Sequence, residues 1–190
     1  YIMGILNVTP DSFSDGGKYK RLDTALIHAG NMLEEGADIL DIGGESTRPG
    51  HQQISTEEEI QRVVPVIEKV KSRFDVPVSV DTYKPEVAKA ALAAGADLIN
   101  DIWGLKYDPE MASVIAGSGA ACCLMHNRKE AEGPSPYGYS RLIPDMLEDL
   151  KETLHLARRA GIPEDKIILD PGVGFGKTYE MNLEVLKNLR

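Results

Sequence analysis

Polar side chains gather in a loop directly after the first apolar run of the chain. The run Tyr1–Leu6 is followed by Asn7-Val8-Thr9-Pro10-Asp11-Ser12-Phe13-Ser14-Asp15-Gly16-Gly17. The proline and the glycine pair are typical of turns. A plain connector would be shorter and would not need an aromatic residue or so many side-chain oxygens. We therefore expect this loop to form part of an active site at the carboxyl end of a buried strand.

Polar residues also follow the later apolar runs. Gly43-Gly44-Glu45-Ser46-Thr47-Arg48-Pro49-Gly50 comes after a run over 37–42, and Asp170-Pro171-Gly172-Val173-Gly174-Phe175-Gly176-Lys177 comes after a run over 166–169. Single polar residues stand at the remaining ends, namely Asp81, Asn100, Asp101 and His126. Side chains at the carboxyl ends of parallel strands in a barrel face one common site.

The elements that position these residues alternate between strands and helices. Apolar residues at helical spacing predict a helix over 22–34, and a capping box at Ser55/Glu58 or Thr56/Glu59 predicts a second helix to about Arg73, with Pro65 as a local flaw. We expect further helices over 85–94, 108–116, 143–160 and 179–189, and further strands over 76–80, 96–101 and 120–125. The stretches Gly36-Ala37-Asp38-Ile39-Leu40-Asp41 and Gly95-Ala96-Asp97-Leu98-Ile99-Asn100 form a weak internal repeat.

Two architectures fit this alternation, an open doubly wound sheet and a (β/α)8 barrel. The strands are apolar on both faces, as parallel strands covered by helices must be. No Gly-x-Gly-x-x-Gly follows the first strand, and polar residues end almost every strand rather than one switch point. We therefore predict an α/β fold, a (β/α)8 TIM barrel of which about six βα units are present. We expect one domain over 1–190, truncated at both ends.

Composition excludes several classes of partner. The 190 residues carry a formal net charge of −9, which argues against a general nucleic-acid or anionic-membrane binder. No apolar run approaches the ~20 residues of a membrane span. The only cysteines, Cys122 and Cys123, are adjacent, so they suit two buried thiols better than a disulfide or a metal site. These features predict a cytoplasmic protein.

The polar loops carry a family resemblance. Residues 2–17 and 36–50 closely resemble the first two signature motifs of dihydropteroate synthases. Val80-Asp81-Thr82, Ile99-Asn100-Asp101, Leu124-Met125-His126 and residues 170–177 are similar to further positions of the family, in the same order. The resemblance covers essentially the whole chain.

This resemblance implies a particular reaction on a (β/α)8 barrel. The family joins 6-hydroxymethyl-7,8-dihydropterin pyrophosphate to p-aminobenzoate, which gives 7,8-dihydropteroate and pyrophosphate, and sulfonamides inhibit it. Its members typically use Mg²⁺ and form homodimers. The family's Ser-Arg-Lys and Arg-x-His motifs have no counterpart before Arg190, so we expect this chain by itself to lack a complete site.

The resemblance also assigns residues to the two substrates. It implies that the polar edge of the pterin is bound by Asp81, Asn100 and Asp170, and that the pocket walls are Ile102, Met125 and Phe175. It places Asn7 near the metal and pyrophosphate. Thr47 and Arg48 would bind pyrophosphate or shape the p-aminobenzoate site, which Phe13, Pro49 and Phe175 would complete. Asp11 and Asp15 would make metal or loop contacts, and the candidate catalytic residues are Asp11, Phe13, Asp15 and Arg48.

Other interpretations remain open for some of these residues. Asp81 or Asp170 could instead cap the helix that follows it. We expect His126 to have a structural or supporting role and Lys177 to lie on the solvated surface. At the level of the whole chain, the alternatives are the pterin-binding domain of a corrinoid-dependent methyltransferase, a non-catalytic pterin-binding homologue and an unrelated phosphate-binding barrel.

Overall fold

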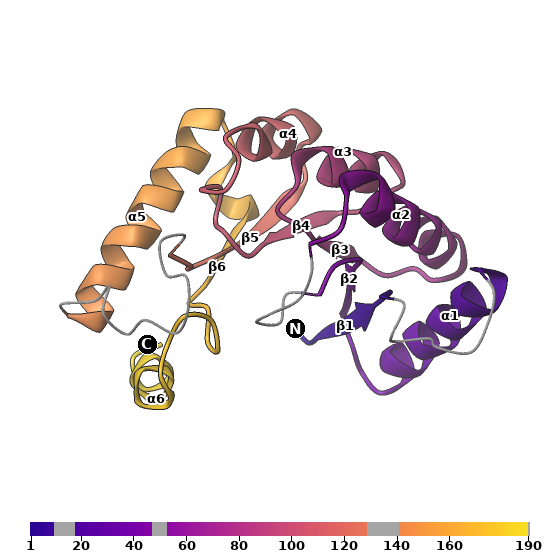
Figure 1. Ribbon diagram of the computed structural model, residues 1–190, viewed down its shortest axis with the longest axis horizontal. Helices are drawn as coiled ribbons and strands as arrows, with labels where there is room; N and C mark the ends of the chain where they lie inside the picture. The colour runs from indigo at the N-terminus through magenta and orange to yellow at the C-terminus, as the bar shows by residue number, and fades with distance from the viewer. Residues whose placement is uncertain (10–17, 47–52, 129–140, 190) are drawn as a thin grey trace. The chain divides into compact units, whose positions relative to one another are not determined.

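The computed structural model describes residues 1–9, 18–46, 53–128 and 141–189 (Figure 1). These residues fall into two compact units, Tyr1–Asn100 and Asp101–Arg190, which we treat separately. Within the described residues, no helix has both the length and the apolar character needed to cross a bilayer.

The first unit consists of parallel strands separated by helices. Its elements are β1 (Met3–Asn7), α1 (Lys18–Glu34), β2 (Ile39–Gly43), α2 (Thr56–Arg73), β3 (Val78–Asp81), α3 (Pro85–Ala93) and β4 (Leu98–Asp101), whose last residue lies past the unit boundary. β1 pairs with β2, β2 with β3 and β3 with β4, all in parallel. Leu6, Ile42, Val80 and Ile99 are fully buried, as are the α2 residues Val63 and Ile67.

The second unit repeats the alternation. It contains α4 (Glu110–Ser118), β5 (Ala121–Met125), α5 (Leu142–Ala160), the 3₁₀ turn η3 (Glu164–Lys166), β6 (Ile167–Asp170) and α6 (Tyr179–Lys187). β5 and β6 pair in parallel. Leu142 and Met146 of α5 pack with Val185 of α6 in a small apolar cluster. Cys122 and Cys123 are both buried free thiols, which confirms the prediction for this pair.

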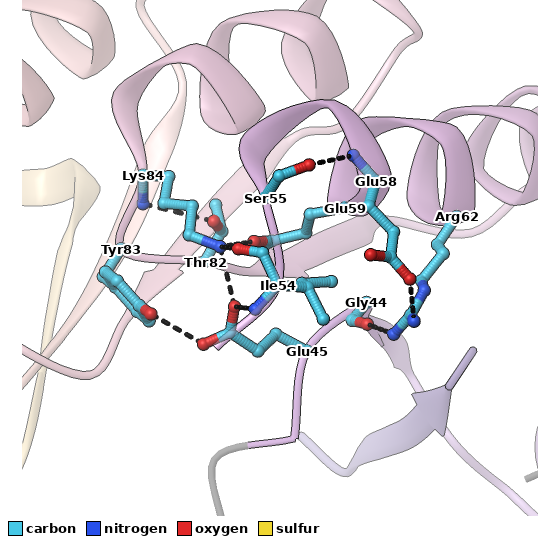
Figure 2. Close-up of polar contacts among 10 residues, drawn as sticks. All are labelled: Gly44, Glu45, Ile54, Ser55, Glu58, Glu59, Arg62, Thr82, Tyr83 and Lys84. Carbon is cyan, nitrogen blue, oxygen red and sulfur yellow. Dashed lines mark hydrogen bonds and ion pairs between the residues drawn. The ribbon is translucent and has the colours of Figure 1, made fainter. Parts of the chain in front are cut away.

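The predicted order of elements is confirmed, and most differences lie at their ends. α1 begins at Lys18, four residues before the apolar periodicity starts. Ser55 is the N-cap of α2 and accepts from the Glu58 N–H at 3.1 Å, so Ser55 rather than Thr56 caps the helix, whereas the Glu58 carboxylate pairs with Arg62 (Figure 2). Pro65 lies inside α2, which continues past it to Arg73. The turn η3 was not predicted, because three residues are too few to show a period.

Both copies of the predicted internal repeat have the same structural role: each ends a helix and starts a strand. Gly36 and Gly95 have φ of +104° and +105°, a region that favours glycine and turns the chain out of its helix. The Asp38 carboxylate then accepts from the Ile2 N–H at 2.7 Å, and the Asp97 carboxylate accepts from the Val78 N–H at 2.8 Å. Each aspartate thus fixes the entry of one strand beside its neighbour.

Candidate active site

One row of the strand ladder carries the polar ends of the first unit. The register pairs Asn7 with Gly43, Gly43 with Asp81, and Asp81 with Asn100. Asn7 is exposed, and Asp81 and Asn100 are half-buried, so their side chains are accessible. Residues paired in this way project to the same face of the sheet. The structure therefore places the three predicted residues of this unit side by side.

Gly43 is the member of this row that carries no side chain. A Cβ atom at this position would lie 3.3 Å from Asn7 Oδ1 and 3.7 Å from both the Cβ and Oδ2 of Asp81. The amide oxygen and the carboxylate thus approach the same small volume, from the two strands that flank β2. Hard oxygen donors that approach one position suit a cation or a polar ligand group.

A buried aspartate, Asp41 of β2, orients the side chain of Asn100. The Asn100 Nδ2 donates to Asp41 Oδ2 at 3.1 Å, and Asp41 is only 4% exposed. Burial raises the pKa of Asp41, against the opposing effect of the hydrogen bond from Asn100. Because Asp41 accepts one of the two amide N–H groups, the Asn100 amide is held in one orientation, in which its oxygen can accept a hydrogen bond from a ligand.

Asp41 belongs to a second row of polar atoms beneath the first. It pairs in register with Ser79, which is fully buried. Among the described residues, neither Asp41 Oδ1 nor Ser79 Oγ has a hydrogen-bond partner. Buried polar atoms without a partner are costly. Sequence reasoning missed Asp41, although an aspartate inside the apolar strand Ile39–Gly43 was a signal that could have found it.

In the second unit, the ends of β5 and β6 hold the other predicted residues. Met125 pairs in register with Asp170 and is 3% exposed. Asp170 Oδ1 accepts from the Gly172 N–H at 2.7 Å, and Phe175 is half-buried in the loop that follows. Ile102 is also half-buried, in a turn whose backbone is held by Asp101: its carboxylate accepts from the N–H groups of Trp103 and Leu105 at 2.9 and 2.7 Å.

The prediction that Lys177 lies on the surface is wrong. Lys177 is 9% exposed, and its ammonium donates to Gly172 O at 2.9 Å, Phe175 O at 3.1 Å and His126 Nδ1 at 3.3 Å. Burial lowers the pKa of Lys177 to about 8. The lysine therefore ties together the glycine-rich loop on which it stands, and sequence spacing alone could not show the two carbonyls folding back around it.

His126 has the supporting role that the sequence predicted. It is 1% exposed, its Nε2 lies 2.9 Å from Asp149 Oδ2, and burial lowers its pKa. A neutral imidazole that donates from Nε2 accepts at Nδ1, where Lys177 donates. Burial alone would raise the pKa of Asp149, but hydrogen bonds from Arg128, at 2.7 Å, and from His126 outweigh it and lower that pKa.

The helix-capping alternative is wrong for both aspartates. The N-cap of α3 is Lys84, and the N-cap of α6 is Thr178, whose side chain accepts from the Met181 N–H. Asp81 and Asp170 therefore belong to the strand ends rather than to helix termini. The remaining predicted site residues lie outside the described part of the chain, namely Asp11, Phe13, Asp15, Thr47, Arg48 and Pro49.

Comparison with known proteins places this arrangement in a family. Residues 3–190 match the family described as pterin binding enzyme. The chain is 58% identical to a dihydropteroate synthase of Clostridium beijerinckii over 189 residues, 100% of this chain and 68% of that protein. It is 57% identical to a dihydropteroate synthase of Bacillus subtilis, over 99% of this chain and 64% of that protein. The chain belongs to the dihydropteroate synthases. It spans about two thirds of the length of these relatives.

Solved structures of the family match throughout the chain. A dihydropteroate synthase of Clostridium difficile, in the presence of pteroic acid, matches with a TM-score of 0.92 and 50% identity, over 100% of this chain and 70% of that one. A Xanthomonas albilineans dihydropteroate synthase with 4-aminobenzoic acid matches with a TM-score of 0.90 and 44% identity, over 99% of this chain and 67% of that one. The predicted α/β fold, about six units of a (β/α)8 barrel, is confirmed, and so is the predicted transferase family.

Gly172 provides a test of the loop that Lys177 holds. Its φ is +68°, and an added Cβ would lie 2.3 Å from His126 O. Gly174 has a φ of +89°, but an added Cβ would meet nothing within 4 Å. We expect Gly174→Ala to cost about 1 kcal/mol through the left-handed backbone alone. Gly172→Ala should cost about 2 kcal/mol more, because of the clash. Urea unfolding of the full-length protein measures both, and equal losses would contradict the described packing.

Lys177 should also make stability depend on pH. The folded protein releases its proton near pH 8, whereas the unfolded chain keeps it to the ordinary value of 10.5. Between these values the unfolded state binds more protons, so the free energy of unfolding should rise with pH, by up to about 3 kcal/mol. Lys177→Met should lack this rise. Parallel pH slopes for wild type and variant in chemical unfolding would refute the lowered pKa.

Proposed function

We propose that this chain supplies the pterin and pyrophosphate sites of a dihydropteroate synthase, which condenses 6-hydroxymethyl-7,8-dihydropterin pyrophosphate with p-aminobenzoate. The observation that supports this is the row Asn7, Gly43, Asp81 and Asn100. It presents an amide oxygen, a glycine, a carboxylate and an oriented amide at the ends of four adjacent strands. A flat ring with a donor-rich edge needs this kind of partner.

Asp81 and Asn100 take the polar edge of the pterin in this proposal. The carboxylate of Asp81 accepts from ring and amino N–H groups. The oxygen of Asn100 accepts a further one, and the hydrogen bond from the amide nitrogen to Asp41 fixes the orientation of this side chain. The family resemblance gives Asp170 a third contact to this edge and makes Ile102, Met125 and Phe175 walls of the pocket. Those four assignments stay predictions.

The donors of the first unit fit Mg²⁺ shared with a polyphosphate. The described residues hold no group of three or more histidine, cysteine, aspartate or glutamate side chains suited to a metal. Mg²⁺ is commonly bound by only one or two protein oxygens together with substrate phosphates and water. Asn7 Oδ1, beside Gly43, is such an oxygen. When bound, Mg²⁺ would neutralise charge on the departing pyrophosphate.

Catalysis then requires binding and positioning more than proton transfer. Loss of pyrophosphate breaks the bond between the methylene carbon and oxygen, and the electron-rich dihydropterin stabilises the cationic carbon. The arylamine nitrogen forms the new bond to carbon and passes one proton to water. It is a weak, neutral nucleophile, so holding it near the methylene carbon is the main requirement. We assign that role to Phe13, Arg48 and Pro49, with Asp11 and Asp15 as metal or loop contacts and Thr47 on the pyrophosphate.

Two broader properties belong to the same proposal. We expect the full-length protein to be a homodimer and to act in the cytoplasm, with small molecules rather than nucleic acid or membrane as partners. The net charge of −9 supports the last expectation.

The reaction can be tested directly. Full-length protein is incubated with the dihydropterin pyrophosphate, radiolabelled p-aminobenzoate and Mg²⁺, and labelled dihydropteroate is separated and counted. We expect Mg²⁺-dependent product. Pterin binding without turnover would favour a non-catalytic homologue, and methyl transfer from a methylfolate would favour the pterin-binding domain of a methyltransferase.

Replacement of Asp81 tests the assigned pocket. Asp81→Ala removes the carboxylate at the centre of the row, so we expect pterin affinity to fall at least about 100-fold, as the loss of a charged hydrogen-bonding group implies. Asp75→Ala, at an exposed aspartate three residues before β3, is the control and should bind normally. Calorimetric titration with the pterin gives both affinities. A folded Asp81→Ala protein with wild-type affinity would remove Asp81 from the site.

A further inference from the structure

A buried lysine ends the loop that follows β6, and no step of the proposed reaction uses it. The Lys177 ammonium donates to Gly172 O at 2.9 Å, to Phe175 O at 3.1 Å and to His126 Nδ1 at 3.3 Å. An ammonium has three N–H donors, so these acceptors occupy all of them. Lys177 therefore has no donor left for a substrate, and its effect on one must pass through the residues that it binds.

Lys177 and Asp170 are linked through a single residue, Gly172. The Asp170 carboxylate accepts from the Gly172 N–H at 2.7 Å, and the Gly172 carbonyl accepts from Lys177. The backbone of Asp170 is held as well, because its carbonyl accepts from the His126 N–H at 2.7 Å. Movement of Gly172 away from Lys177 would therefore change the direction of the Asp170 carboxylate.

Gly172 packs closely against the end of β5. An added Cβ would lie 2.3 Å from His126 O and 3.3 Å from both Met125 Cγ and the Lys177 ammonium nitrogen. Only glycine permits so close an approach, which holds the loop backbone against β5. Met125 is a predicted wall of the pterin pocket, so the same contacts bring the loop to that wall.

The same ammonium also fixes the backbone of Phe175. It binds the Phe175 carbonyl, and the Phe175 N–H donates to Gly172 O at 3.2 Å. Both backbone groups of Phe175 are thus bound inside the loop, and its half-buried side chain extends from a backbone that is held on both sides. The wall of a preformed pocket for a flat ring needs this support.

A second set of contacts holds the ammonium in place from α5. His126 Nε2 lies 2.9 Å from Asp149 Oδ2, and Arg128 donates to the same oxygen at 2.7 Å. An imidazole that donates from Nε2 to this carboxylate presents Nδ1 as an acceptor to Lys177. Burial lowers the pKa of Lys177, and the negative charge of Asp170 opposes that shift. The ammonium is thus stabilised by the carboxylate whose position it helps to fix.

We propose that Lys177 is a positioning residue of the pterin site. It holds Asp170 and Phe175 in the arrangement that receives the pterin ring, by binding the backbone of the loop that joins them. The inference rests on the proposed function, which gives Asp170 and Phe175 their contacts with the pterin. An apolar side chain of similar length could fill the same volume but could not bind the two loop carbonyls.

A double-mutant cycle tests whether Lys177 acts through Asp170. In the full-length protein at pH 7, we expect Lys177→Met to lower affinity for a pterin without pyrophosphate about 10-fold and Asp170→Asn to lower it about 100-fold. The double variant should bind within about threefold of Asp170→Asn alone, because Lys177 then has no carboxylate to position. Combined with Asp81→Asn, the loss from Lys177→Met should multiply instead. Ligand-detected NMR titration with the pterin measures these weak affinities.

Kinetics and amide exchange separate positioning from a general loss of structure. In Lys177→Met we expect KM for the dihydropterin pyrophosphate to rise about 10-fold while kcat stays within about twofold, because the groups placed on the pyrophosphate are unchanged. The Gly172 amide, which donates to Asp170, should exchange faster.

Two further variants make the result interpretable. Lys71→Met is the matched control, because Lys71 also donates to a backbone carbonyl, that of Val76 at 3.4 Å, two residues before β3. It should leave KM and kcat unchanged. Lys177→Gln keeps two N–H donors for the loop carbonyls on a shorter side chain. It should fold even if Lys177→Met does not, with a smaller rise in the same KM.

The outcomes separate this inference from the proposed function. Losses that multiply in Lys177→Met/Asp170→Asn would overturn it. Wild-type KM in folded Lys177→Met or Lys177→Gln protein would also overturn it, and so would an equal rise in KM for Lys71→Met. Absence of dihydropteroate synthesis by the wild-type protein would contradict the proposed function instead. In that case, amide exchange at Gly172 in Lys177→Met, which needs no substrate, would still decide whether Lys177 holds the loop beside Asp170.

Discussion

The register of four parallel strands is the constraint on which the arrangement of the candidate site depends. A shift of one residue in any pair would turn its side chains to the opposite face. The observed register puts Asn7, Gly43, Asp81 and Asn100 in one row and keeps their apolar neighbours in the core. The glycine–alanine–aspartate junctions before β2 and β4 fix this register, because each aspartate binds the backbone N–H of Ile2 or Val78 at the entry of the adjacent strand.

Two buried carboxyl groups near this row, those of Asp41 and Glu45, are stabilised in different ways. Asp41 has no cation bonded to it among the described residues, and burial raises its pKa while it orients Asn100. Glu45 has Lys84, and its pKa is lowered. The first arrangement sets the direction of one amide, and the second joins Glu45 to Lys84 at the start of α3. Both stabilise one precise geometry at a cost in desolvation, as expected for a reaction that depends on positioning.

The sequence predicted those features that depend on local pattern. Alternating apolar runs gave the order of the elements, and polar residues at their ends gave Asp81 and Asn100, because strand ends in a parallel sheet meet at one edge. Features that depend on distant partners were missed. Glu45 and Lys84 are 39 positions apart, and Lys177 and His126 are 51 apart, so no periodicity links them. Lys177 was assigned to the surface because a lysine is usually exposed and its three acceptors are visible only in the fold.

The most direct test is to add a side chain at the glycine of the row. In Gly43→Ala the new methyl group would lie between Asn7 and Asp81, where the nearest atom is a side-chain oxygen that can shift. The protein should therefore fold. Calorimetric titration of full-length Gly43→Ala with the dihydropterin pyrophosphate and Mg²⁺ is compared with Gly117→Ala, where an added Cβ has no neighbour within 4 Å. We predict affinity at least about 10-fold weaker for Gly43→Ala and unchanged for Gly117→Ala. Wild-type affinity in folded Gly43→Ala would contradict the assignment of this row to the substrate.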